Sequence, residues 1–197
     1  MTLLRIPEGS ARLSLPEGQC RSCGKAVIRF NSMQVICATL KCARAVPVIN
    51  RKEEKAKDRA TREAQKTLPE LRVEAQEAFN AFIRARDAGQ SCICCGRFPQ
   101  SESLTGGSWD AGHYRGRGAA PELAFDERNC HLQLKRCNHR AWDVAGYRAR
   151  LIAKIGLAEV ESLEGPHEAK KYTRDDMRDI RDAYRIKAKA LIAKQEG

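Results

Sequence analysis

The sequence predicts an α+β fold that is mainly helical, with two small cysteine-rich modules and long basic helices. Three observations favour this class: cysteines closely paired in two segments, apolar residues recurring at three- and four-residue steps, and a glycine-rich stretch with hairpin character. A chain of 197 residues can form one core of ordinary size or two small modules, but is too short for a large multidomain enzyme.

The charge balance indicates an acidic partner. Lysine and arginine number 36 against 25 aspartate and glutamate residues, which gives a formal net charge of +11 and an isoelectric point near 9.4. Such a surplus favours a polyanion, and nucleic acid is the commonest one. No apolar run approaches the roughly 20 residues of a membrane span, so we expect no transmembrane segment and no membrane partner.

The nine cysteines are expected to be reduced. Residues 1–16 lack the apolar stretch and cleavage site of a secretory signal, so we expect a cytoplasmic protein. In that compartment, closely paired cysteines more often hold metal than form disulfides. The odd number of cysteines also argues against a fully paired disulfide framework.

The first cysteine module lies in an N-terminal segment, residues 1–48. Two residues separate Cys20 from Cys23, four separate Cys37 from Cys42, and a β-rich stretch lies between the pairs. Four thiolates so spaced can surround one tetrahedral Zn²⁺, which replaces the core that a short segment cannot build. Buried structural thiols are the alternative, which fits the polar first knuckle poorly. The module either stiffens the fold or also grips a DNA backbone.

Residues 49–89 are predicted to form two linker helices. Residues 51–66 hold seven basic and four acidic side chains with almost no apolar ones, which is typical of a solvated helix. Thr67 and Glu70 have capping-box spacing around Pro69, so a second helix should begin there. It carries one predicted buried stripe, formed by Leu71, Ala75, Ala78, Phe79, Phe82 and Ile83.

Two more apolar stripes follow the second cysteine module. Asp143 is suited to cap a helix that stops at Gly156, and Thr173 with Asp176 can cap a last helix within residues 157–197, a basic helical region. The first stripe comprises Val144, Tyr147, Leu151, Ile152 and Ile155. The second comprises Met177, Ile180, Tyr184, Ala188 and Leu191.

Residues 90–156 concentrate the reactive side chains, with three of the four histidines and five of the nine cysteines. The pair Cys92 and Cys95 comes first, then His113, Asn129 and the run Cys137-Asn138-His139. This order resembles the zinc-stapled HNH nucleases, whose active unit is a β-hairpin followed by a helix around one catalytic metal. The resemblance implies a ββα-metal, HNH-like unit in this segment.

The resemblance narrows to the NinG (Rap) recombination proteins of lambdoid phages and covers roughly residues 70–195. It implies a structure-specific endonuclease that cleaves Holliday junctions and D-loops in phage homologous recombination. Branched DNA and recombination proteins are the implied partners, in the cytoplasm of the bacterial host. The strings that carry the likeness are Asn80–Arg84, Cys92–Gly96, Trp109–Arg115, Phe125–Asn129 and Cys137–Asn138.

Phosphodiester hydrolysis gives these residues their expected roles. A water must be deprotonated for in-line attack, and neutral imidazole suits that task near pH 7, so His113 is the expected general base. Asn129 is expected to orient it, through its side-chain amide or the neighbouring backbone. Mg²⁺ or Mn²⁺ must neutralise charge on the phosphate and the departing oxygen, and we expect Asp110, Asn138 and His139 to bind it.

Each role has a simpler alternative. His113 is alternatively a zinc ligand or a turn histidine, Asn129 a turn cap, and His139 a ligand of the structural zinc. Asp110 and His113 would face opposite sides of a regular strand, so only a bulge or turn brings both to one metal. Many HNH proteins carry a metal-binding aspartate directly before the histidine, where this chain has Gly112.

The second zinc site has three expected ligands, Cys92, Cys95 and Cys137. A second Cys-x2-Cys pair would need a cysteine at position 134, where Leu134 stands. A metal-free module packed around these thiols is the alternative. The fourth ligand is expected to be Cys130, with His131, His139 and Cys94 as alternatives.

Basic side chains are expected to hold DNA phosphates, with little dependence on sequence and steep weakening by salt. The helices at 51–66 and 174–194 would grip separate duplex arms, unless they are merely solvated faces. The expected DNA-binding residues near the hairpin are Arg115, Arg117, Arg128, Lys135, Arg136 and Arg140.

Three functions fit to different degrees. A metal-dependent endonuclease for branched DNA, with structural Zn²⁺ and catalytic Mg²⁺ or Mn²⁺, is favoured by the order of His113, Asn129 and His139. A non-catalytic zinc-containing adaptor that binds DNA or recruits a recombinase is the alternative. A transcriptional regulator ranks last because no helix-turn-helix pattern is evident. Cutting two opposed strands of a junction favours a homodimer, although no heptad seam marks one.

Overall fold

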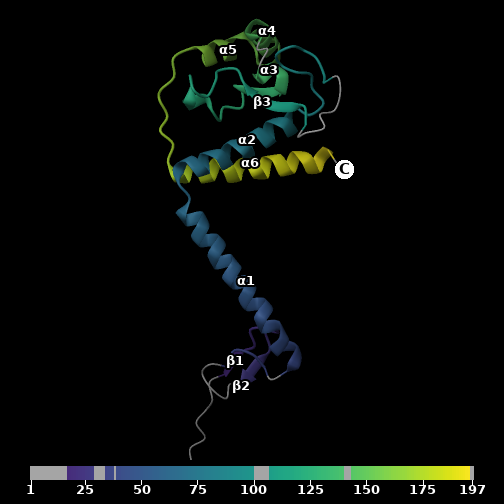
Figure 1. Ribbon diagram of the computed structural model, residues 1–197, viewed down its shortest axis with the longest axis vertical. Helices are drawn as coiled ribbons and strands as arrows, with labels where there is room; N and C mark the ends of the chain where they lie inside the picture. Colours follow the sequence, from purple (N-terminus) through teal and green to yellow (C-terminus); the bar gives the residue numbers. More distant parts are fainter. Residues whose placement is uncertain (1–16, 29–33, 38, 100–106, 140–142, 196–197) are drawn as a thin grey trace, which may run out of the picture. The chain divides into compact units, whose positions relative to one another are not determined.

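The computed structural model describes residues 17–28, 34–37, 39–99, 107–139 and 143–195 (Figure 1). The chain divides into two compact units, Met1–Gln65 and Lys66–Gly197. The first contains β1 (Glu17–Gln19), β2 (Ala26–Ile28) and α1 (Leu40–Gln65). The second contains α2 (Leu68–Arg86), β3 (Trp109–His113), the 3-10 helix η1 (Pro121–Leu123), β4 (Cys130–Leu134), α3 (Lys135–His139), α4 (Val144–Ile155), α5 (Leu157–Glu164) and α6 (Arg174–Gln195). The predicted mainly helical α+β class is confirmed.

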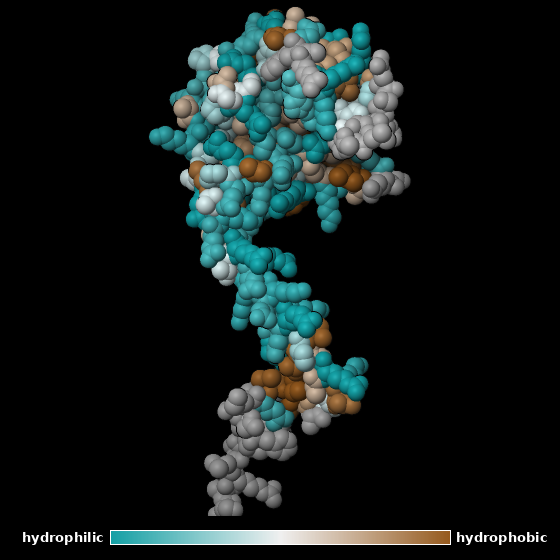
Figure 2. Space-filling model, in the orientation of Figure 1, coloured by the Kyte–Doolittle hydropathy of each residue, from teal (hydrophilic) through white to brown (hydrophobic). Residues whose placement is uncertain are grey.

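The first unit joins a short antiparallel ladder to one long helix. β1 pairs with β2, with Gly18 opposite Val27. α1 begins at Leu40, well before the predicted start at residue 51, and runs through Pro47. Thr39 caps it, because its Oγ1 accepts a hydrogen bond from the N–H of Cys42 at 3.4 Å. The basic part of α1 is exposed, as predicted, and forms a hydrophilic surface (Figure 2).

The described part of this first unit has almost no apolar core. Among its described residues, the only buried side chains of apolar type belong to Cys20 and Cys42. The three hydrophobic clusters of the described chain all lie in the second unit. A unit that buries so little hydrocarbon needs another source of stability.

The second unit is built on the pair α2 and α6, which lie side by side (Figure 1) and make the most extensive contact between elements. The predicted stripe of α2 is buried throughout. Both helix starts are confirmed: the N–H of Thr67 donates to Glu70 Oε2 at 2.8 Å, and the N–H of Thr173 donates to Asp176 Oδ2 at 2.7 Å.

A two-stranded antiparallel hairpin lies between the helical layers. β3 pairs with β4 in a regular register over five residues, with Asp110 opposite Gln133 and His113 opposite Cys130. One face packs on α2, where Ala111 and Cys130 join the cluster around Phe79. The other packs on α4, whose Tyr147 hydroxyl donates to the carbonyl of Gly112 at 2.9 Å. The hairpin is therefore fixed from both sides.

Two details differ from the sequence predictions. Val144, predicted to point inward, is exposed, because it is the first helical residue after the Asp143 cap and lies on the outer side of α4. The four predicted segments differ from the two compact units, since α2 and α6 come from different segments yet pack together. None of the helices in the described part of the chain has the length and apolar character needed to cross a membrane.

Candidate functional site

The four cysteines of the first unit lie together. The Sγ atoms of Cys20, Cys23, Cys37 and Cys42 are all within 4.8 Å of one another. Cys23 Sγ and Cys37 Sγ are 3.8 Å apart, which matches the edge of about 3.8 Å of a sulfur tetrahedron built on Zn–S bonds of about 2.3 Å. The backbone N–H of Cys37 is the main cause that lowers the pKa of Cys20 to about 6. The cluster can therefore hold a zinc ion.

In the second unit, the Sγ atoms of Cys92, Cys95 and Cys137 are likewise within 4.8 Å of one another. No fourth ligand from the described residues joins them. The backbone N–H of Leu134 donates to Cys92 Sγ at 3.3 Å, and the Leu134 side chain lies in the same buried cluster. Position 134, where a second Cys-x2-Cys pair would need a cysteine, therefore borders this group. The three thiolates alone can hold a zinc ion.

The candidates for the fourth ligand are all engaged elsewhere. Cys130, the first choice, lies at the far end of β4 from Leu134, where its Sγ is 3.6 Å from His113 Nδ1. Cys94 Sγ accepts a hydrogen bond from the N–H of Asp143 at 3.3 Å. His131 and His139 contact Asp87 and Asp110, respectively. The expectation that Cys130 completes this site is not met, because Cys130 lies four residues from Leu134 along β4, at the end of the strand that packs with Phe79 of α2.

His113 ends β3 on the face that packs against α2. Its Nε2 lies 3.0 Å from the carbonyl oxygen of Ala124, and its ring centroid is 6.0 Å from that of Phe79. Burial lowers the pKa of His113 below its usual value, although the Ala124 carbonyl opposes the shift. Burial also raises the pKa of Cys130, so this neighbour stays a neutral thiol. The arrangement favours a neutral imidazole that donates through Nε2.

Asn129 is fully buried and secures the chain that leaves β3. Its Oδ1 accepts from the N–H of Arg115 at 2.7 Å, and its Nδ2 donates to the carbonyls of Arg115 and Leu123 at 3.0 and 3.1 Å. Its own carbonyl accepts from the N–H of Tyr114 at 2.8 Å. Asn129 therefore reaches His113 through the adjoining backbone, and its side chain takes the alternative role of fixing a turn.

Asp110, Asn138 and His139 come together at the start of the hairpin. Asp110 Oδ2 accepts from Asn138 Nδ2 at 3.1 Å and lies 3.0 Å from His139 Nε2. The strand β3 supplies the carboxylate, and α3, which follows β4 directly, supplies the other two side chains. A cation here would find a carboxylate oxygen of Asp110 and an imidazole nitrogen of His139, while water completes its shell. Asn138 would add its amide oxygen only after its side chain turns, because its Nδ2 now faces Asp110.

His113 lies on one face of the hairpin, and the group of Asp110, Asn138 and His139 lies on the opposite face. The ladder from Trp109 to His113 is regular, so the side chains of Asp110 and His113 diverge. Replacing Gly112 with the aspartate common in HNH proteins would require Gln133 to move, because a Cβ at position 112 would lie 1.8 Å from Gln133 Oε1 and 2.9 Å from Gln133 Cβ. Gln133 fills this space with a buried amide whose Nε2 has no hydrogen-bond partner among the described residues.

Comparison with known proteins identifies the family of this chain. The family model described as Bacteriophage Lambda NinG protein matches residues 13–195. The chain belongs to the NinG family. It is 44% identical over 119 residues to protein ninG of Salmonella phage P22 and 43% identical over 119 residues to that of Escherichia phage lambda. Each alignment covers 60% of this chain, with 56% of the P22 protein and 55% of the lambda protein.

The chain thus spans little more than half the length of these NinG relatives. Comparison with solved structures gives no match. The predicted NinG resemblance is confirmed, while the HNH-like catalytic unit stays a prediction.

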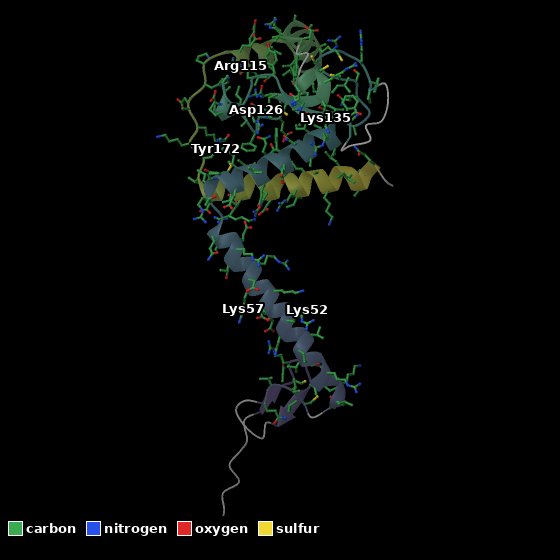
Figure 3. The ribbon with its side chains drawn as sticks, viewed as in Figure 1. Lys52, Lys57, Arg115, Asp126, Lys135 and Tyr172 are labelled. Atoms are coloured by element: carbon green, nitrogen blue, oxygen red, sulfur yellow. The ribbon has the colours of Figure 1, made fainter. Side chains whose placement is uncertain are left out.

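The predicted DNA-binding residues of this NinG-family chain fall into two groups. Arg115, labelled in Figure 3, donates to the carbonyl of Glu164 at 3.0 Å. Arg128 pairs with Asp126 at 2.7 Å although its side chain is 44% exposed, so both guanidinium groups already have partners within the chain. Arg117 and Arg136 are exposed, and Lys135 is half-buried. Arg140 lies outside the described residues. Along α1, Lys52 and Lys57 extend from the helix (Figure 3).

A buried charged network was missed by the sequence reasoning. Asp87 accepts from the N–H of Leu132 at 3.1 Å, from Arg86 Nη2 at 2.8 Å and from Lys154 Nζ at 3.0 Å. Burial would raise the pKa of Asp87, but hydrogen bonding with His131 and Arg86 lowers it far below its usual value. The network ties β4 to α2 and α4. No sequence signal distinguishes Asp87 from an ordinary polar residue at a helix end.

Proposed function

We propose that this chain is a divalent-metal-dependent endonuclease that cleaves branched DNA, such as Holliday junctions and D-loops, in phage homologous recombination. The observation that carries the proposal is the convergence of Asp110, Asn138 and His139 on the strand–strand–helix unit. The side chain of His139 is 67% exposed and that of Asp110 is 24% exposed. A DNA phosphate can therefore approach the group from solvent.

Mg²⁺ or Mn²⁺ held by Asp110, Asn138 and His139 would supply the positive charge that phosphodiester cleavage needs on the phosphate and the leaving oxygen. The residues of the chain hold this cation and orient the substrate around it. Asp110 carries the only formal negative charge of the three, so its carboxylate is the main electrostatic anchor.

The general base is proposed to be His113. Burial lowers its pKa, which keeps the imidazole neutral and able to accept a proton at pH 7. With Nε2 donating to Ala124, Nδ1 is the basic nitrogen, and it must exchange its contact with Cys130 for a water molecule. His139 is the competing base, because Asp110 orients its Nε2 and the exposed ring leaves Nδ1 to solvent.

A non-catalytic DNA-binding or recombinase-recruiting adaptor is the second candidate. One observation favours it: both ring nitrogens of His113 contact protein atoms, and the ring lies on the face opposite Asp110. The net charge of +11 suits either function.

Cleavage assays separate the two candidates. A labelled four-way junction, a D-loop and a linear duplex are incubated with the full chain, with and without Mg²⁺ or Mn²⁺. The variants are Asp110→Asn, His113→Gln and His139→Gln, with His167→Gln as the matched control, because His167 hydrogen-bonds the carbonyl of Leu163 away from both groups. Affinity for the junction is measured in parallel without divalent metal.

We expect metal-dependent cleavage of the branched substrates, lowered by about 10²- to 10⁴-fold in Asp110→Asn and in the variant lacking the base. The His167→Gln control should cut like the wild type. Cleavage by His113→Gln at the wild-type rate would reject His113 as the base. Loss of cleavage in His139→Gln is expected in either case, because His139 is a proposed ligand of the cation. Junction binding without cleavage under either metal would reject the endonuclease in favour of the adaptor.

A further inference from the structure

A small cavity beside His113 has a cationic lining. It has a volume of about 80 Å³ and lies between α2, the chain connecting β3 to β4, and the segment before α6. The lining residues are Arg72, Gln76, Arg117, Pro121, Ala124, Phe125 and Tyr172. Only Arg117 among them was predicted to bind DNA.

Positive charge gathers around this cavity without a compensating carboxylate on the arginines. Among the described residues, neither Arg72 nor Arg117 forms an ion pair. The guanidinium carbon of Arg72 lies 5.9 Å from the ring centroid of Tyr172, and Lys170 Nζ lies 4.9 Å from the same centroid. Three carboxylates, those of Glu122, Asp126 and Asp176, act on Tyr172. Asp126 is paired with Arg128, and Asp176 accepts a hydrogen bond from the N–H of Thr173. The cavity is therefore suited to an anion.

The polar lining is fixed in place. Gln76 is 7% exposed, and its Nε2 donates to Asn80 Oδ1 at 2.8 Å. Burial raises the pKa of Tyr172, so the phenol stays neutral and adds no negative charge. Its hydroxyl donates to the carbonyl of Glu122 at 3.3 Å. The ring of Tyr172, labelled in Figure 3, therefore contacts both Arg72 and Lys170 while its hydroxyl is fixed by the Glu122 carbonyl.

The size of the cavity selects the kind of anion. One water needs about 10–15 Å³ of the volume open to the centre of a water-sized sphere. By this measure the cavity of about 80 Å³ holds a handful of waters or one tetrahedral oxyanion, but no nucleobase. Arginine is the side chain best matched to phosphate, because its planar fork can donate two parallel hydrogen bonds. A single phosphate group is the ligand that matches both the charge and the volume.

The cavity adjoins the proposed general base. Ala124 lines it, and the carbonyl of Ala124 accepts the hydrogen bond from His113 Nε2 at 3.0 Å. We propose that Arg72, with Arg117 and Gln76, forms a subsite for one phosphate of the DNA backbone next to His113. The proposal rests on the proposed function for its ligand, DNA, and it assigns Arg72, Gln76 and Tyr172 a role that neither charge pattern nor motif indicated.

Binding of the full chain to a four-way junction without divalent metal tests the subsite. The variants are Arg72→Gln and Arg117→Gln, and the matched control is Arg84→Gln, which removes the same charge from an exposed position of α2 outside the cavity. Each cavity variant should bind about tenfold more weakly and lower the slope of log affinity against log salt by about 0.9. The control should change affinity less than about twofold.

Two further arms keep the result interpretable. Arg72→Lys retains the charge without the fork and should fall between wild type and Arg72→Gln, while unchanged thermal melting confirms that the variants are folded. Junctions with and without 5′-phosphates separate backbone phosphates from strand ends. A loss of affinity seen only with 5′-phosphorylated ends would overturn a backbone subsite.

Measuring both affinity and cleavage distinguishes failure of the phosphate subsite from failure of the proposed endonuclease. If the wild type binds but never cleaves, and Arg72→Gln still loses affinity relative to Arg84→Gln, the endonuclease is rejected and the subsite is retained. If cleavage occurs, but Arg72→Gln and Arg84→Gln have equal affinities and salt slopes, the subsite is overturned while the endonuclease is retained.

Discussion

Two histidine rings are shielded from solvent, His131 fully and His113 in part. His113 donates to a backbone carbonyl, and His131 lies between Arg86 and the carbonyl of Arg128, with ring nitrogens 3.0 Å from each. Burial lowers the pKa of both rings below the usual value. Each ring therefore couples its protonation to the integrity of the hairpin.

This coupling predicts acid sensitivity. Because the folded pKa values lie below the unfolded value of about 6.5, the unfolded chain binds more protons as the pH falls. The stabilising contribution is complete above about pH 6.5 and is lost as the pH falls toward the folded pKa values, by up to about 1.4 kcal/mol per pH unit for each histidine.

Urea unfolding at a series of pH values between about 7 and 5 measures this slope. The variant His113→Gln should lose the contribution of one titrating group to this slope, whereas His167→Gln, on the segment between α5 and α6, should keep the wild-type slope. An unchanged slope in His113→Gln would contradict a buried neutral ring at this position.

The roles of single residues were predicted best where their spacing in the sequence is enough to indicate a metal site. The four cysteines of the first unit were recognised from their two pairs, and the structure brings their sulfur atoms together. Asp87 and Gln76 could not be predicted, because a buried polar side chain is chosen by partners that are distant in the sequence. Asp87 meets Leu132 and Lys154 only when α2, β4 and α4 pack together.

At the scale of elements, helix starts followed the sequence more closely than strand partners did. The capping side chains at Thr67, Asp143 and Thr173 act within four residues, so local sequence determines them. The start of α1 was missed because that helix was expected from the charged run at 51–66, whereas it already begins at Leu40 and includes Pro47. The alternation of side chains along β3 correctly predicted that those of Asp110 and His113 point to opposite faces.

The strand β4 also decides how the second cysteine cluster is completed. Leu134 borders Cys92 and belongs to the same core as Cys137, so Leu134→Cys should supply a fourth thiolate at Cys-x2-Cys spacing. We expect zinc to leave this site about tenfold more slowly under chelator competition. In the cobalt-substituted site, thiolate charge-transfer absorption should rise by about a third, from three ligands to four.

The matched control is Leu134→Ala, which removes the same buried side chain without adding a sulfur. It should lower stability by about 2–5 kcal/mol and leave the metal exchange rate unimproved. Equal chelator resistance in the two variants would show that position 134 does not reach the metal.

At the scale of the whole molecule, the two units draw on different sources of stability. The second unit holds three hydrophobic clusters, while the described part of the first buries little apart from its cysteines. This contrast could be anticipated from composition, since residues 51–66 have almost no apolar side chains. The packing of α2 on α6 could not be anticipated, because an amphipathic stripe shows which face of a helix is buried but not which element packs against it.

Removal of metal should therefore affect the units unequally. A strong zinc chelator is expected to unfold the first unit, raising amide exchange and protease cleavage in residues 17–37, while the α2–α6 pair stays protected. Hydrogen exchange read by mass spectrometry gives both regions in one experiment. Retained protection at Cys20 and Cys42 after complete zinc removal would show that this unit folds without a metal.

The partial exposure of the first cysteine cluster has a chemical consequence. Cys37 Sγ is partly open to solvent, and its hydrogen bond with the Thr39 hydroxyl lowers its pKa, so peroxides can attack it and first form a sulfenic acid. Oxidation of this sulfur would remove one ligand from the four-cysteine cluster, whereas the apolar clusters around Phe79 and Leu71 in the second unit contain no thiol open to solvent among their described residues.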